Sequence, residues 1–293
     1  MYIVRTNGFN YKAYANEQEL YSSIQPGECP TDTSALDISF TADQLQAGRK
    51  LLEDSIQIDS CKTDLEKLLS INHFLYEKIC FERPSGKSQK TYPNPVSYFL
   101  AVQKEKDLLF HCGHAAYLQA FFCSAVNIKI RGIQHIQRPQ AHSTLGSHTY
   151  NEVWLRELGQ WVISDFFQNR YLIYSQEKYW TAIDLFEHAR KGDSIEVKII
   201  GSKSGKISTY TKKLSDPYFT NDYYLLFYKE TNPAIVYCWK NKIRHYLLGY
   251  SHFKTYDPIA PNSNNLYWMR SAVFAFAMIW FSIFIIQLIK TRL

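Results

Sequence analysis

Near its C-terminal end the chain carries an uncharged run of 19 residues, Ser271 to Ile289, between Arg270 and Lys290. As a helix that rises about 1.5 Å per residue, this run spans about 28 Å, close to the hydrocarbon thickness of a bilayer. Tyr267 and Trp268 precede it, as an interfacial aromatic pair would. The alternative is a buried terminal core helix, but such helices rarely lack a polar stripe over this length. The run therefore predicts a single transmembrane helix over 271–289.

The basic residues around this helix do not orient it, because Lys254 and Arg270 before it are balanced by Lys290 and Arg292 after it. The first ten residues contain neither the apolar run nor the small-residue cleavage site of a signal peptide. We therefore expect a C-terminal tail anchor that crosses the lipid bilayer once. The part of the chain upstream of the anchor is expected in the cytoplasm.

The rest of the chain has the composition of a folded protein. With 293 residues, 46% of them hydrophobic and 20% charged, it resembles neither a disordered nor a fibrous chain. Aromatic residues make up 16%, which favours a fold that contains strands. The net charge of +6 is mild and no basic stripe with interleaved aromatic residues occurs, so nucleic acid is not expected as a partner.

Six cysteines are spread through the chain without a CxxC pair. This number is too small for a disulfide scaffold, and the spacing does not suit a structural zinc site. Free thiols in a reducing compartment are therefore expected. The cysteines are Cys29, Cys61, Cys80, Cys112, Cys123 and Cys238.

Hydrophobic periodicity predicts both helices and strands upstream of the apolar run. The clearest amphipathic helix is Thr63–Ile79, where apolar residues recur at helical spacing. Residues 198–213 contain five lysines and no acidic residue, which is typical of a solvated hairpin, although at a membrane surface they could meet lipid phosphates. The other predicted segments are helices at 96–102 and 111–126, strands at 127–134, 148–156, 160–166, 196–200 and 209–214, a turn at 201–205, and loops at 83–95 and 136–146.

One group of residues carries the chemistry. Cys112 begins a predicted helix, where backbone amides and the helix dipole stabilise a thiolate. A thiolate nucleophile needs a general base nearby and a third group that orients the base, and His148 and Asp165 lie on the next two predicted strands after the helix exit. A hairpin that turns at Leu158-Gly159 places Asp165 opposite Glu152, about four positions from His148. Twist or a bulge must shorten that offset.

The residues around this group resemble a known family. The helix opens with Cys112-Gly-His-Ala-Ala-Tyr-Leu, and the exit strand begins Asn127-Ile-Lys-Ile-Arg-Gly-Ile. The segment His148-Thr-Tyr-Asn-Glu-Val-Trp is similar to the motif His-x-Trp-x-Glu-Val, and Gln160-Trp-Val-Ile-Ser-Asp165 is similar to Trp-x-x-x-Asp. Together these segments resemble the transglutaminase-like branch of the papain-like thiol enzymes over residues 60–170.

The resemblance implies an α+β fold in which a catalytic helix packs on an antiparallel sheet, followed by the C-terminal transmembrane helix. It implies a cysteine-dependent amide hydrolase or acyl transferase that works through a thioester, with Cys112 as nucleophile, His148 as base and Asp165 as its orienting group. Hydrolysis, as in a cysteine protease, is favoured over amine transfer. A protein or peptide substrate is expected, and no cofactor or metal. The predicted segments are an N-terminal accessory segment (1–59), the catalytic core (60–175), a Tyr-rich mixed α/β extension (176–266) and the membrane helix.

Four features depart from the family pattern. His111 precedes the nucleophile, and His114 stands where the family often has an acidic or small polar residue. Tyr150 replaces the usual Trp, and Phe166-Phe167 follow the Asp in place of Pro-Thr. None of these changes removes a catalytic group, but together they leave the acyl-donor preference open. The backbone amide of Cys112 would serve an oxyanion hole, whose side-chain partner stays unassigned.

Three other interpretations remain open. The domain could be catalytically silent and bind peptides or a partner at the membrane, or it could be an adaptor in which the helix matters more than the cleft. A metal could be held by His111, Cys112 and His114 with His135 or His142, although no pair among them has a usual zinc spacing. The reactivity of the Cys112 thiol distinguishes an enzyme from the first two.

Overall fold

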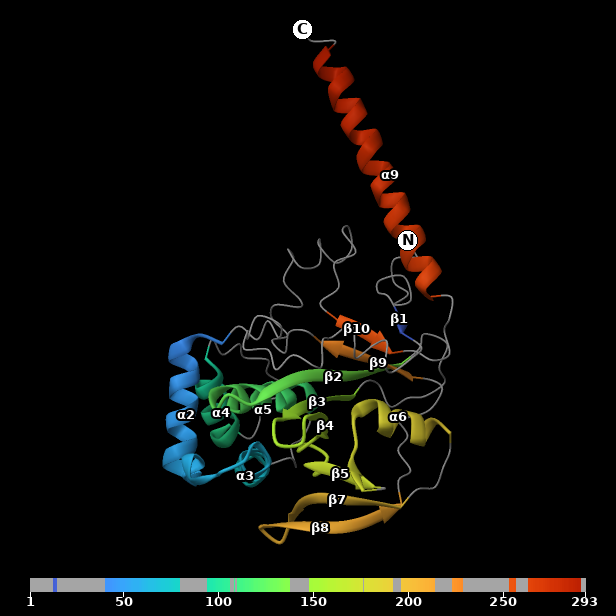
Figure 1. Cartoon of the computed structure of the whole chain (residues 1–293). Coiled ribbons are helices and arrows are strands. Elements are labelled where there is room, and N and C mark those ends of the chain that lie inside the picture. Colours follow the sequence, from blue (N-terminus) through green and yellow to red (C-terminus); the bar gives the residue numbers. More distant parts are fainter. Residues whose placement is uncertain are drawn as a thin grey trace. The chain divides into compact units, whose positions relative to one another are not determined.

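A computed structural model of the chain describes residues 13–14, 40–79, 94–105, 108, 110–137, 148–175, 177–191, 196–213, 223–228, 253–256 and 263–290 (Figure 1). The chain divides into two compact units, residues 26–232 and residues 1–25 together with 233–293, and each is described by itself. Most of the predicted accessory segment and of the loops predicted at 83–95 and 136–146 lies outside the described residues.

The larger unit mixes helices with antiparallel strands, which agrees with the predicted α+β class. The helices predicted at 63–79, 96–102 and 111–126 and the strands predicted at 127–134, 148–156 and 160–166 are all present. Its elements are α2 (Ala42–Ile56), a short 3₁₀ turn η3 (Ile58–Ser60), α3 (Asp64–Lys78), α4 (Pro95–Lys104), α5 (Cys112–Ala125), β2 (Lys129–Gln137), β3 (His148–Leu155), β4 (Gln160–Ser164), β5 (Leu172–Ser175), β6 (Lys178–Tyr179), α6 (Ala182–Arg190), β7 (Glu196–Lys203), β8 (Lys206–Lys213) and β9 (Tyr223–Tyr228).

Two antiparallel sheets organise this unit. The first has the strand order β9-β2-β3-β4 and the second the order β6-β5-β7-β8. Helix α5 packs on β2 and β3 of the first sheet, and α2, α3 and α4 contact α5. Because nine of the 14 residues of α5 are buried, this helix is the centre of the unit.

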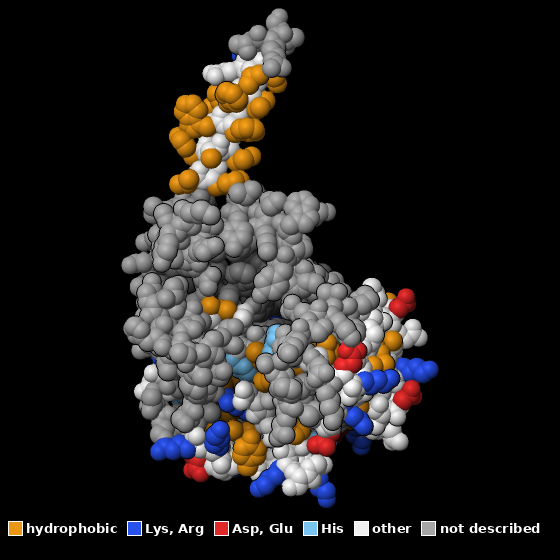
Figure 2. All heavy atoms as spheres, turned by 180° about the vertical axis from the view of Figure 1, so that it is seen from behind, with side chains coloured by type: hydrophobic (Ala, Val, Ile, Leu, Met, Phe, Trp, Pro, Cys, Tyr) orange, Lys and Arg blue, Asp and Glu red, His pale blue; other side chains and the backbone are white. Residues whose placement is uncertain are grey.

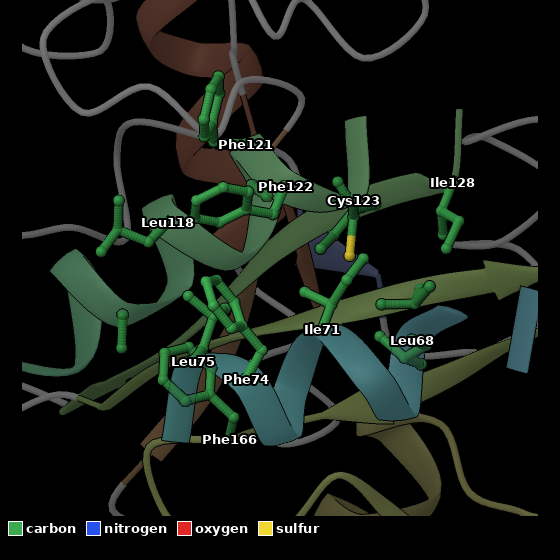
Figure 3. Packing of buried hydrophobic residues seen from close by; sticks show 14 of the residues in the cluster. Leu68, Ile71, Phe74, Leu75, Leu118, Phe121, Phe122, Cys123, Ile128 and Phe166 are labelled. Atoms are coloured by element: carbon green, nitrogen blue, oxygen red, sulfur yellow. The ribbon is translucent and has the colours of Figure 1, made fainter. Parts of the chain in front are cut away.

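The hydrophobic core lies between the helices. Figure 3 shows side chains of α3 and α5 facing one another, with Phe74 close to Phe122. On another side of α5, Gly48 of α2 lies so close to Phe121 that a Cβ at this position would come within 2.6 Å of the ring. Helix α2 and η3 therefore belong to the same core as α5, and their residues Leu52 and Ile58 have no exposed surface.

The start of α3 follows from its first residues and is fixed to the first sheet. Thr63 Oγ1 accepts a hydrogen bond from Glu66 N, and Glu66 Oε2 accepts one from Thr63 N, which makes a capping box. The buried Asp64 carboxylate binds the Arg156 guanidinium through two hydrogen bonds, of 2.7 and 2.5 Å. Since Arg156 lies in the turn between β3 and β4, this ion pair ties the hairpin to α3.

The β3–β4 hairpin has a register that differs from the predicted one. Leu155 pairs with Gln160 across a four-residue turn that ends at Gly159, where φ is +61°. The prediction assumed a two-residue turn at 158–159, which is wrong because Gly159 occupies the left-handed position at the end of a longer loop. Asn151 therefore pairs with Ser164, and Asp165 follows the last paired residue.

The lysine-rich stretch forms the predicted hairpin of β7 and β8. The strands run further than expected, up to a two-residue turn of Ser204 and Gly205, which both have positive φ as a type I′ turn requires. Strand β8 is the last in the order of its sheet and is exposed along most of its length. Its exposed residues include Lys206, Ile207 and Lys212.

The smaller unit contains two short parallel strands and one long helix. The strands are β1 (Ala13–Tyr14) and β10 (Phe253–Tyr256), and the helix is α9 (Ser263–Lys290). Within α9, residues Ala272–Lys290 have a mean hydropathy of 2.4, which makes this segment long and apolar enough to cross a membrane. Figure 2 shows hydrophobic side chains all along the described part of this helix. Of the predicted interfacial pair, Tyr267 and Trp268, the structure describes only the backbone.

Candidate active site

Cys112 is the first residue of α5, and its neighbours fix the start of the helix. His111 is the N-cap residue, and its Nδ1 accepts a hydrogen bond of 3.2 Å from Gly113 N. The amides of a first helical turn have no helical acceptor, so they and the helix dipole favour negative charge at this end of α5. The half-buried Cys112 side chain stands at this point, as the sequence predicts.

His148 and Asp165 are brought together by the ends of their strands. The two side chains are buried, and His148 Nε2 lies 2.8 Å from Asp165 Oδ2. The observed register accounts for this contact: one step beyond the Asn151–Ser164 pair places Asp165 opposite Tyr150, only two residues from His148 and on the same side of the sheet. The predicted offset of four positions was therefore too large.

The Asp165 carboxylate is held by its own turn. Its backbone forms a pair of hydrogen bonds with Arg170, N to O at 2.7 Å and O to N at 2.8 Å. Gln168 N, inside that turn, donates to Asp165 Oδ1 at 3.2 Å. One carboxylate oxygen is therefore bound by the turn, while the other is directed at His148.

The surroundings of Cys112 favour its thiolate. Burial alone would raise the pKa of the Cys112 thiol, but hydrogen bonds from the side chains of His111 and His148 and from the backbone of Thr149 lower it to about 6. The free thiol Cys123, eleven residues further along α5, has no exposed surface, and burial raises its pKa far above the usual range. One helix therefore carries both an activated and an inert cysteine.

The same contacts favour the charged form of His148. Burial disfavours an imidazolium, but the Asp165 carboxylate and the Cys112 side chain raise the pKa of His148 to about 10. Between pH 6 and 10 the pair is therefore a thiolate and an imidazolium. Since Nε2 faces Asp165, Nδ1 is the ring nitrogen left to face the sulfur.

A buried polar network connects α5 to the strands that carry His148 and Asp165. Gln119 Nε2 donates to Asn72 Oδ1 at 2.6 Å and to Ser164 Oγ at 2.8 Å. Asn151 Nδ2 donates to Gln119 Oε1 at 2.7 Å and to the carbonyl of Ala116 at 2.8 Å. Because Asn151 lies in β3 and Ser164 precedes Asp165, the network sets the height of α5 above the sheet.

The glutamate of the His-strand motif has a structural role. Glu152 and Arg131 of β2 form a buried ion pair, in which the guanidinium also lies 4.1 Å from the centre of the Trp161 ring. The second Glu152 oxygen accepts a hydrogen bond of 2.6 Å from Ala182 N, at the start of α6. This residue therefore joins β2, β3 and α6 rather than facing Cys112.

Aromatic side chains lie around the His148 ring. Tyr150, which replaces the family's Trp, has its hydroxyl 2.6 Å from His135 Nε2, and its ring centre lies 5.6 Å from that of His148. Phe167 lies 6.5 Å from His148 and 6.3 Å from Phe110, measured between ring centres. The departures from the family pattern at Tyr150 and Phe167 therefore fall next to His148.

The alternative metal site would need His135 or His142 in addition to His111, Cys112 and His114. His135 is completely buried and hydrogen-bonded to the Tyr150 hydroxyl, while His142 lies outside the described residues. Among the residues that the structure describes, no group of three His, Cys, Asp or Glu side chains is arranged to hold a metal ion.

Sequence reasoning named Cys112, His148 and Asp165 but missed their supports. His111 was noted only as unusual, although it is the N-cap residue of α5 and lowers the pKa of the Cys112 thiol. Gln119 and Asn151 were not selected at all. The sequence did contain a signal for Gln119, because it is the one amide side chain inside the long apolar stretch of the helix predicted at 111–126.

A comparison with known families agrees with this architecture. Residues 54–166 match the model of the transglutaminase-like superfamily, whereas no curated protein and no solved structure matches the chain. The matched segment begins at the end of α2 and ends one residue after Asp165, so it contains Cys112, His148 and the network around Gln119. Residues 54–166 are therefore similar to the core domain of the transglutaminase-like superfamily.

Proposed function

We propose that the protein is a cysteine-dependent amide hydrolase or acyl transferase that acts on a protein or peptide. The observation that carries this proposal is the buried pair of His148 and Asp165, in which His148 Nε2 lies 2.8 Å from Asp165 Oδ2 and His148 lowers the pKa of the Cys112 thiol. Nucleophile, base and orienting group in this order form the arrangement that thiol enzymes use. The match of residues 54–166 to the transglutaminase-like superfamily supports the same chemistry.

The geometry supports a two-step reaction. The Cys112 thiolate attacks the amide carbonyl carbon, and the C=O electron pair moves to the oxygen. When the C–N bond breaks, the His148 imidazolium gives its proton to the leaving amine, and a thioester remains on Cys112. Neutral His148 then takes a proton from water or from a second amine, which attacks the thioester and releases the sulfur. Hydrolysis and amine transfer differ only in this second nucleophile, and we favour hydrolysis.

We further propose that α9 spans the bilayer and anchors the enzyme, with the domain on the cytoplasmic side. The length and hydropathy of Ala272–Lys290 support the anchor. The free thiols Cys61, Cys112 and Cys123 support a reducing compartment, because paired cysteines are usual in oxidising ones.

Thiol alkylation tests the proposed chemistry. At pH 6 about half of Cys112 is thiolate, so iodoacetamide should modify it faster than the half-buried Cys61 of the same molecule. Peptide mapping by mass spectrometry identifies the modified residue. If Cys112 reacts no faster than Cys61, and Cys112→Ser keeps full biological activity, the proposal is wrong and the protein is a binding module.

A further inference from the structure

The turn that begins at Asp165 is closed by Asn169. Residues 166–169 form this turn between Asp165 and Arg170, and Asn169, its last residue, has a φ of +54°. The backbone N of Asn169 donates a hydrogen bond of 3.0 Å to the carbonyl of Phe166. Asparagine adopts this left-handed backbone conformation more readily than most residues do, so it suits the closing position of the turn.

The side chain of Asn169 binds the backbone of a different hairpin. Asn169 Nδ2 donates to the carbonyl of Ser202 at 2.9 Å, and Ser202 N donates to Asn169 Oδ1 at 2.7 Å. The side-chain amide therefore pairs with both backbone groups of one residue in β7, as a neighbouring strand would. From β8, the Tyr210 hydroxyl donates to the carbonyl of Asn169 at 3.1 Å. These three hydrogen bonds join the turn to the β7–β8 hairpin.

The contact between the turn and the hairpin is close. A Cβ at Gly201 of β7 would lie 2.5 Å from the carbonyl oxygen of Asn169 and 2.9 Å from its Oδ1, so the approach depends on a glycine. The next residue, Ser202, is itself held by α3, because its Oγ donates to Glu77 Oε1 at 3.4 Å. The turn is therefore fixed to a strand that is anchored elsewhere in the unit.

The same turn sets the direction of the Asp165 carboxylate. Oδ1 accepts a hydrogen bond from Gln168 N inside the turn, and Oδ2 lies 2.8 Å from His148 Nε2. A hydrogen bond between nitrogen and oxygen is lost beyond about 3.2 Å. A displacement of the turn by about 1 Å would therefore break the contact with His148.

We propose that Asn169 is a positioning residue, through which the β7–β8 hairpin holds the Asp165 carboxylate against the His148 ring. The inference rests on the proposed thiol chemistry. It adds a support from outside the family match, which ends at residue 166. Because Asn169 is proposed to act through Asp165, its effect on His148 should disappear once the carboxylate has been removed.

Three substitutions separate this role from a general effect on the fold. Asn169→Gly removes the two side-chain hydrogen bonds but leaves a residue that adopts positive φ without strain. Tyr210→Phe removes only the hydroxyl that binds the Asn169 carbonyl. Asn127→Gly is the matched control, because Asn127 also has a positive φ, of +59°, and is exposed at the other end of α5 from Cys112.

The measurement is the titration of the His148 ring. Full-length protein in detergent, isotope-labelled in its histidine rings, is titrated by NMR, and His148 is identified by the signal missing from His148→Gln. The pKa of His148 in the wild type is about 10. Cys112 and His135 also lie beside this ring, and both stay unchanged in every variant.

Asp165→Asn defines the full effect and should lower the His148 titration by about 1–3 pH units, the change typical for an opposite charge at this distance. Asn169→Gly keeps the charge but loosens it, and should lower the titration by about one third to one half of that amount. Tyr210→Phe should act in the same direction, and Asn127→Gly should match the wild type. Combined with Asp165→Asn, Asn169→Gly should cause no further change.

Other results overturn the inference. If Asp165→Asn lowers the titration but Asn169→Gly and Tyr210→Phe do not, the hairpin does not hold the carboxylate. If circular dichroism shows that Asn169→Gly is unfolded, Tyr210→Phe decides alone. An effect of Asn169→Gly that persists beside Asp165→Asn would assign it to another charge of the turn, such as Arg170.

Failure of the proposed function gives a different result. In that case iodoacetamide modifies wild-type Cys112 no faster than Cys61, whatever the variants do to the His148 ring. A reactive Cys112 with an unmoved His148 titration in Asn169→Gly and Tyr210→Phe would leave the proposed chemistry in place and remove only the role of Asn169.

Discussion

At the scale of single residues, the site depends on two proton equilibria with opposite signs. Cys112 becomes a thiolate as the pH rises through about 6, and His148 loses its proton as the pH rises through about 10. Attack needs the thiolate and departure of the amine needs the imidazolium. We therefore predict a bell-shaped acylation rate with limbs near pH 6 and pH 10, which belong to the coupled pair. Stopped-flow acylation by a p-nitroanilide, whose leaving group is an amine, measures it, and a flat profile would contradict the ion pair.

Asp165 determines the upper limb of that profile. Its carboxylate is the main group that raises the pKa of His148, and Asn at this position keeps the shape but not the charge. We predict that Asp165→Asn lowers turnover by at least about 100-fold and moves the upper limb to lower pH. Circular dichroism checks the fold. Loss of turnover with an unmoved upper limb would show that the charge of Asp165 does not act on His148.

The sequence was most informative at this scale. The three residue types and their order along the chain were enough to select Cys112, His148 and Asp165. The sequence did not reveal that His111 is the N-cap residue of α5, because histidine is not among the residues usually found at this position. Nor did it reveal the register, which depends on whether Gly159 closes a two-residue or a four-residue turn.

At the scale of elements, α5 contacts the sheet through buried polar side chains close to the candidate active site. Gln119 is buried and makes hydrogen bonds to Asn72, Ser164 and Asn151. We predict that Gln119→Ala lowers the free energy of unfolding by about 1–3 kcal/mol, since it leaves buried polar partners unsatisfied. Gln103→Ala, at an exposed position of α4, should change it by less than about 0.5 kcal/mol. Urea denaturation compares them, and equal effects would contradict the role of the network.

The contribution to stability of the Asp64–Arg156 ion pair, which joins α3 to the β3–β4 turn, should depend on pH. Burial opposes ionisation of Asp64, but its hydrogen bonds with Arg156 lower its pKa below the ordinary value of 3.8. A carboxyl with a lowered folded pKa stabilises the fold above its unfolded pKa, and this contribution disappears as the pH falls through the folded value. Asp64→Asn should therefore be less stable than the wild type at pH 6, and the difference should narrow below about pH 4.

Thermal unfolding at several pH values measures this difference. Asp54→Asn, at an exposed position of α2, is the matched control and should follow the wild type throughout. A constant difference for Asp64→Asn at every pH would mean that packing, rather than charge, accounts for its contribution.

Elements with a clear apolar stripe were predicted within a few residues of their observed ends. The helix expected at Thr63–Ile79 is α3, and its capping box agrees with the start. Helix α2 was not predicted. One of its contacts with α5 is made through Gly48, which lets the Phe121 ring approach the backbone and adds no apolar residue to the pattern, whereas Leu52 of the same helix is fully buried.

At the scale of the whole molecule, the candidate active site and the apolar helix belong to different units. Cys112, His148 and Asp165 lie in the unit of residues 26–232, and α9 lies in the other. We predict that the full chain needs detergent for extraction, whereas a chain lacking residues 267–293 stays folded and soluble with unchanged Cys112 alkylation. Fractionation with and without carbonate and detergent measures this. Soluble full-length protein would contradict the anchor.

The extent of the core could not be read from the sequence. The catalytic core predicted at 60–175 stays a prediction. The hydrophobic core also contains fully buried residues of η3 and of the C-terminal half of α2, and the family match begins at residue 54. Sheet pairings between distant segments, such as β5 with β7, depend on contacts that no local pattern encodes.

Strand β8 has a consequence for how copies of this molecule meet one another. The last strand of a sheet presents unpaired backbone groups that can recruit the same strand of a second copy. Here that strand carries Lys206, Lys212 and Lys213, and Lys203 faces Lys206 across the turn. Copies held in one bilayer by the proposed anchor would meet at high local concentration, and like charges on both approaching strands oppose such pairing. The lysines would then keep crowded copies of the protein apart.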